Sequence, residues 1–178
     1  MNVVDALKAC LPHVAKNVAL PVLEGVRLKN GRAYATDRYT LAISDYQFEG
    51  EDHDVFVSVE NAKRIISAGS DVARVENGQI VLVNGAVFPT PEMSSVGDYP
   101  DVDKLVENWA AGELGQVSFQ TRFLDRFAAK HFPYRNAKDR QGHTVTFEMG
   151  VEATKPVRVT VPGFPWFVGL VVPRKVEV

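Results

Sequence analysis

The sequence has 178 residues, of which 46% are hydrophobic and 24% charged, a composition typical of a globular protein with one or two small domains. Its formal net charge of -2 gives no overall attraction for nucleic acid, and no apolar run approaches the roughly 20 residues that span a bilayer, which argues against a membrane protein. The N-terminus lacks the basic and apolar regions of a secretory signal, and Cys10, the single cysteine, cannot form an internal disulfide, so a cytoplasmic protein is expected.

Apolar residues recur at helical spacing over residues 2–16, which predicts an amphipathic helix. Pro12 lacks an N–H and clashes with the preceding turn, so this helix is expected to kink or end near Leu11. Cys10 lies on the apolar face, where a buried, inert thiol is a better interpretation than a nucleophile.

A β-hairpin is predicted over residues 20–42, because two apolar runs flank Asn30-Gly31, a pair that tolerates the positive φ values of a type I′ turn. The polar run at 36–40 interrupts the second strand before apolar residues resume it. This pattern predicts an ordered polar cluster at a strand bend. From the residues alone, a plain turn closed by the Thr36 and Asp37 side chains is the favoured interpretation.

Residues 58–69 predict a second, short helix, which Ser58 caps and Gly69 ends. After it, Asn-Gly pairs at 77–78 and 84–85 separate three short apolar runs. Each pair is a strong turn signal, so these runs predict a three-stranded antiparallel meander.

A third helix is predicted to begin near Thr121, which can cap it. Arg122, Arg126 and Lys130 follow one another at intervals of four and would form a basic stripe on one side of this helix. A solvated surface is the commoner role of such a stripe. Strands are expected at residues 144–149, 157–161 and 166–172.

Two segments near the N-terminus, Leu-Pro-x-Leu-x-Gly at 20–25 and Ala-Thr-Asp-x-aromatic-x-Leu-Ala at 35–42, resemble the second domain of bacterial DNA polymerase sliding clamps. Tyr-Pro-Asp at 99–101, before an expected apolar strand or turn, resembles the closing segment of the same domain. The run Leu-Val-Val-Pro-Arg at 170–174 resembles the family's C-terminal strand, with Val172 in place of the usual Met. An ordinary edge strand that ends at a proline would give the same pattern.

The resemblance implies an α+β architecture, the DNA-clamp fold, built from half-domains that each combine a helix with an antiparallel sheet. Helices expected near residues 2, 58 and 121 give three half-domains in this chain. Residues 1–113 are expected to form one complete domain of the middle type, and residues 115–178 a single half-domain like the end of the last clamp domain. Family rings contain twelve half-domains, so four copies of this chain, a homo-tetramer, would supply a ring.

A peptide groove is the second implication of the resemblance. In the family, DNA polymerases and clamp loaders dock peptide motifs with apolar and aromatic anchors between the middle and last domains. Thr40 stands where the family usually has Arg, and Leu20 where some members have a basic residue, so the preferred peptide is expected to differ. Leu41→Asp is expected to abolish peptide binding. The residues implied for the groove are Leu20, Leu23, Thr36, Tyr39, Thr40, Leu41, Pro100, Leu105, Gln120, Phe123, Leu170, Val171, Val172, Pro173 and Arg174.

Contact with duplex DNA, independent of its sequence, is the third implication, since helices of the family line a central hole. Lysine and arginine side chains supply such a salt-sensitive attraction for phosphates. Reversal of the charges of Arg122 and Arg126 is expected to lower retention on DNA. The basic residues implied to face DNA are Lys8, Lys16, Lys63, Arg64, Arg122, Arg126, Lys130, Arg135, Lys138 and Arg140.

We therefore expect a shortened sliding clamp, of the kind a phage or another mobile replicon encodes, that encircles DNA as a homo-oligomer and docks polymerase peptides. The alternative is a clamp-fold adaptor that does not encircle DNA and binds clamp-interacting peptides or a host clamp. Neither catalysis nor a cofactor or metal is expected, because the four histidines lack metal-ligand spacing and no phosphate loop or nucleophile elbow occurs. A nuclease is a distant third, since the sequence has no carboxylate cluster.

Overall fold

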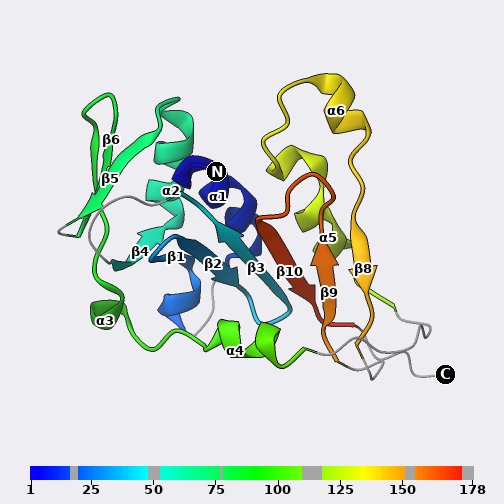
Figure 1. Cartoon of the computed structure of the whole chain (residues 1–178). Coiled ribbons are helices and arrows are strands. Elements are labelled where there is room, and N and C mark those ends of the chain that lie inside the picture. Colours follow the sequence, from blue (N-terminus) through cyan, green and yellow to red (C-terminus); the bar gives the residue numbers. More distant parts are fainter. Residues whose placement is uncertain (17–19, 48–52, 77, 110–117, 151–154, 174–178) are drawn as a thin grey trace.

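The computed structural model describes residues 1–16, 20–47, 53–76, 78–109, 118–150 and 155–173. In these residues ten strands form two antiparallel sheets, and Figure 1 shows their arrangement. The larger sheet has seven strands, in the spatial order β4 (Asp54–Ser58), β1 (Gly25–Lys29), β2 (Arg32–Thr36), β3 (Thr40–Asp45), β10 (Phe167–Val171), β9 (Val157–Thr160) and β8 (Thr146–Glu148). The smaller sheet is the predicted meander, β5 (Val72–Glu76), β6 (Gln79–Leu82) and β7 (Val87–Pro89).

Helices α1 (Val3–Cys10) and α2 (Val59–Ser67) pack against each other beside the larger sheet (Figure 1). Their N-caps are Asn2 and Ser58, whose side chains accept hydrogen bonds from backbone amides of the first turn. At Leu11 the first helix tightens into a 3-10 turn, η1 (Leu11–His13), which accommodates Pro12. The predicted end near Leu11 and the Ser58 cap are confirmed.

The central strand β3 is buried on both faces, because successive side chains point to opposite sides of a sheet. Ala42 joins the main core under α1, whereas Leu41 and Ile43 face a second cluster with Leu170. This second cluster is covered by α4 (Val102–Glu107), which runs along the other side of the sheet (Figure 1).

Strand pairing between β3 and β10 joins the N-terminal and C-terminal parts of the chain. Leu41 lies opposite Leu170, and Thr40 opposite Val171. A side chain at Gly169 would clash here, since a Cβ atom would lie 2.5 Å from the Phe127 ring. The sequence left open whether these parts meet within one chain or between neighbours; the continuous sheet joins them within one chain.

Three sequence-based expectations about local structure are wrong. Residues 36–40 do not bend one strand: they form the turn between β2 and β3, with Arg38 at a φ of 76°. Pro100 is followed by the helix α4 rather than a strand, because the Asp101 side chain accepts a hydrogen bond from the Lys104 amide and caps it. The third helix is four residues long, α5 (Thr121–Leu124), with Gln120 rather than Thr121 at its N-cap.

Short elements complete the fold. The extended backbone of Ala128, with φ -70° and ψ 151°, separates the 3-10 turns that follow α5 and prevents a longer helix. Among the described residues no helix combines the length and the apolar character needed to cross a bilayer. The remaining elements are η2 (Pro21–Leu23), α3 (Met93–Val96), η3 (Asp125–Phe127), η4 (Ala129–His131) and α6 (Ala137–Gln141).

Candidate functional site

The turn at residues 36–40 is held rigid by its own side chains. Asp37 Oδ1 accepts hydrogen bonds from the amides of Tyr39 and Thr40, at 3.0 and 2.8 Å. Thr36 Oγ1 donates to the Thr40 carbonyl oxygen at 2.8 Å and accepts from the Arg38 amide at 3.1 Å. These bonds satisfy the polar groups of a partly buried turn, as the sequence predicted for Thr36 and Asp37.

Arg126 fixes the same turn from the C-terminal part of the chain. Its Nη1 lies 2.7 Å from Asp37 Oδ2 and also donates to the Thr40 hydroxyl, and only 19% of the Arg126 and 12% of the Asp37 side chain are exposed. Its guanidinium also lies 5.1 Å from the centre of the Phe123 ring, on which Tyr39 stacks at 5.4 Å. Loss of either charge would leave the other shielded from water without its partner, so the pair ties the turn to η3.

An apolar groove of about 220 Å³ opens beside this turn. Four separated parts of the chain build it: the turn with the start of β3, the closing segment that includes α4, Pro156 just before β9, and the end of β10 with Val172. Two of its apolar side chains are unusually exposed, Tyr39 at 54% and Leu105 at 56%. The groove is lined by Thr36, Arg38, Tyr39, Thr40, Leu41, Pro100, Val102, Leu105, Pro156, Leu170 and Val172.

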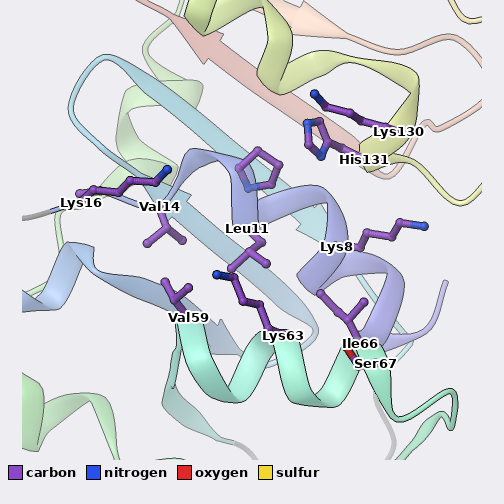
Figure 2. Close-up of a pocket in the computed structure, with 12 residues that line it drawn as sticks. Lys8, Leu11, Val14, Lys16, Val59, Lys63, Ile66, Ser67, Lys130 and His131 are labelled. Atoms are coloured by element: carbon purple, nitrogen blue, oxygen red, sulfur yellow. The ribbon is translucent and has the colours of Figure 1, made fainter.

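A basic hollow of about 450 Å³ lies between α1, α2 and η4 (Figure 2). Its floor is aliphatic, and its rim carries His131 and four lysines from different elements. Burial and the neighbouring charge of Lys130 lower the pKa of His131. The lysines that line the hollow are Lys8, Lys16, Lys63 and Lys130.

Comparisons with known proteins identify the fold. Neither protein-family models nor curated proteins give a match to this sequence. Among solved structures, a putative DNA polymerase III beta subunit from Eubacterium rectale superposes with a TM-score of 0.67 at 14% identity, covering 97% of this chain and 63% of that one. The beta subunit from Thermotoga maritima gives 0.66 at 13% identity, covering 98% and 63%. The DNA polymerase sliding clamp from Bacillus subtilis gives 0.63 at 13%, covering 98% and 62%. This chain has the sliding-clamp fold. It spans less than two thirds of the length of these clamps.

Within this clamp fold, eight residues that the resemblance implied for the groove do line it. They are Thr36, Tyr39, Thr40, Leu41, Pro100, Leu105, Leu170 and Val172. Sequence reasoning missed Arg38, Val102 and Pro156. Val102 could have been inferred from its position two residues after Pro100, but nothing in the sequence around Pro156 indicates that it meets α4.

The other residues implied for the groove lie outside its lining. Leu20 is 40% exposed just before η2, while Leu23 is a buried residue of η2 itself. Val171 points into the main core because it alternates with Leu170. Phe123 supports Tyr39 from behind, next to Gln120, and Pro173 follows the last lining residue. Arg174 lies outside the described residues.

The basic stripe predicted on the third helix is not formed, because that helix ends at Leu124. Arg126 is committed to Asp37, Lys130 pairs with Asp125 at 2.8 Å on the rim of the hollow, and Arg122 lies 4.8 Å from the Phe123 ring centre. Arg122 and Arg126 line a neighbouring hollow of about 550 Å³ that shares Lys16 and His131 with the basic one.

Four basic residues implied to face DNA do not line the basic hollow. Arg64 points away and pairs with Glu60 at 2.7 Å. Arg135, Lys138 and Arg140 are exposed on or near α6, which lies on the far side of the molecule from α2 (Figure 1). Lys8, Lys16 and Lys63 make no ion pair with any described residue, so their charges are available to a ligand.

Proposed function

We propose that this chain is a sliding-clamp-like processivity factor of DNA replication, which encircles duplex DNA as a homo-oligomeric ring and docks peptide motifs of a DNA polymerase or clamp loader. The observation that carries the proposal is the apolar groove at the junction of β3, α4 and β10. Its position, in a clamp fold, coincides with the residues for which the resemblance implies a peptide site.

The groove has the properties that recognition of an extended peptide needs. Its apolar walls supply affinity through burial, while fixed polar groups on the 36–40 turn orient a bound chain. Exposed Tyr39 and Leu105 would otherwise leave apolar surface in contact with water.

The basic hollow has the properties that sliding on DNA needs. Lys8 on α1, Lys16 after η1 and Lys63 on α2 are flexible point charges, so they attract phosphates without reading bases. Contacts of this kind are lost and regained easily as a ring moves along the duplex.

Ring formation rests on the count of half-domains. Three per chain would give twelve in four copies, joined head to tail by a heterologous contact. The larger sheet ends at β8, and the smaller sheet at the opposite end exposes Val83 by 69% and Val87 by 52%. We propose that these two ends meet in neighbouring copies.

Retention on nicked circular DNA tests encirclement. Protein incubated at high concentration with the circle is separated from free protein by gel filtration in moderate salt. We expect co-elution with the circle and loss of the protein when a single restriction cut makes the DNA linear, since a ring slides off free ends. Equal retention on both forms would contradict encirclement.

A clamp-fold adaptor that binds clamp-interacting peptides or a host clamp is the second candidate. It is favoured by the odd number of half-domains. An adaptor would bind peptide in the groove but would show no retention on circular DNA.

A further inference from the structure

Arg38 has a backbone conformation that its side chain does not favour. Its φ of 76° lies in the left-handed region, which side chains other than those of asparagine and aspartate rarely adopt. Among the described residues only Asn30, in an Asn-Gly turn, shares a positive φ without being glycine. The bond from the Arg38 amide to Thr36 uses the backbone alone, so glycine would keep it. The fold therefore gives no reason for arginine here.

The charge of Arg38 is also unused within the described part of the chain. No hydrogen bond or ion pair joins its guanidinium to another residue in the part of the chain that the structure describes, and the side chain is exposed. The adjacent Asp37 carboxylate does not neutralise it, because that carboxylate is bound by the turn amides and by Arg126. Among the described residues that line the apolar groove, Arg38 is the one that carries a charge.

We infer that Arg38 selects a peptide that carries an acidic side chain beside its apolar anchor. The anchor would enter between Leu41, Leu105 and Leu170, and the carboxylate would meet the Arg38 guanidinium at the mouth of the groove. A guanidinium can bind a carboxylate through two parallel hydrogen bonds, which fixes the direction of the peptide as well as adding affinity. Backbone strain retained at a binding site is expected where the side chain serves the ligand rather than the fold. The inference rests on the proposed peptide groove.

Two capped peptides test this selection: acetyl-Gly-Leu-Asp-Leu-Phe-Gly-amide and the same peptide with Asn in place of Asp. Capping removes the terminal carboxylate as a source of negative charge. We expect the wild-type protein to bind the Asp peptide about fivefold more tightly than the Asn peptide, since exposed ion pairs contribute on the order of 1 kcal/mol. Isothermal titration at low and high salt measures this ratio, which should fall towards one in about 1 M NaCl.

Arg38→Gly and Arg38→Ala separate selection from support of the fold. Both should reduce the Asp-to-Asn ratio to about one without weakening the Asn peptide, and Arg38→Gly should melt at the same temperature as wild type or higher, because it relieves the backbone strain. Equal binding of the two peptides to wild type, or a lower melting temperature of Arg38→Gly, would overturn the role of Arg38 while the groove stands. Failure of both peptides to bind wild type would overturn the proposed function together with this inference.

Discussion

The groove and the basic hollow are built in opposite ways. The wall of the groove is fixed: Asp37 holds two amides of its own turn, Arg126 holds Asp37, and the Val172 amide donates to the Tyr39 carbonyl oxygen at 2.8 Å. The hollow has lysines on three separate elements around an aliphatic floor, and Lys8 and Lys63 have no ion-pair partner among the described residues. The difference indicates which ligand each can recognise, because a defined peptide needs a preorganised surface whereas phosphates need only nearby charge.

Leu105→Asp should weaken peptide binding in the groove. Leu105 is 56% exposed, so a charge there should leave the fold intact while it removes an apolar wall, and we expect affinity for the capped Asp peptide to fall about 30-fold. Leu41 is a poorer test because it is 4% exposed and packs in a core cluster, so Asp there would also unfold the protein. The matched control is Leu20→Asp, an exposed leucine outside the groove, which should leave peptide affinity unchanged; an equal loss in both variants would disprove this location of the site.

Arg126→Met should loosen the turn, whereas Arg122→Met removes the same charge without touching Asp37. We expect Arg126→Met to lower the free energy of unfolding by about 2 kcal/mol, because it leaves a carboxylate that is 12% exposed without its cation. Arg122→Met should cost about 0.5 kcal/mol or less. Urea unfolding followed by circular dichroism measures both. Equal losses would show that the Asp37 pair does not anchor the groove wall.

A double substitution, Lys8→Ala with Lys63→Ala, should weaken DNA binding and leave peptide affinity unchanged. Loss of two phosphate contacts is expected to weaken binding to a short duplex about tenfold near 0.1 M salt and to reduce the salt slope by about two. Lys138→Ala with Arg140→Ala, which removes two charges from α6, is the control. Fluorescence anisotropy over a salt series measures the DNA affinity of both double variants. The same loss of affinity in both would show that the hollow does not face DNA.

His13, in the buried core, gives the smallest expected effect. It is fully buried against the rings of Phe127 and Phe167, and burial lowers its pKa from 6.5 to about 3. The unfolded chain binds a proton at His13 more readily than the folded chain does. The free energy of unfolding is therefore highest at pH values above about 6.5 and declines as the pH falls. Between pH 7 and pH 6 the loss should be about 0.7 kcal/mol of unfolding free energy. His13→Leu should reduce this slope in urea titrations and leave the contribution of His131, whose pKa is also lowered; an unchanged slope would contradict a buried neutral imidazole at His13.

Local signals allowed much of the fold to be predicted from the sequence. The Asn30-Gly31 turn, the Ser58 cap and the meander depend on residues that are neighbours in the chain, so their physical causes are visible in the sequence. The short third helix could not be predicted in the same way, because its apolar spacing continues past Leu124 while the backbone of Ala128 is extended.

The site was predicted in part, for the same reason. Groove residues within the 36–41 motif and the Tyr-Pro-Asp segment were found because each motif is contiguous. The partnership of Arg126 with Asp37 was missed, since it joins residues that meet only through the pairing of β3 with β10. Arg126 and Lys130 share a helical spacing in the sequence, but the broken helix sends one to the turn and the other to the hollow.

Both sites serve the proposed function only if copies of the chain close around DNA, and the solution mass tests that claim most directly. Light scattering coupled to size exclusion should give a concentration-independent species of four times the 19.6 kDa chain. A stable species of 19.6 kDa across the same concentrations would contradict a ring and leave the groove to a peptide-binding adaptor.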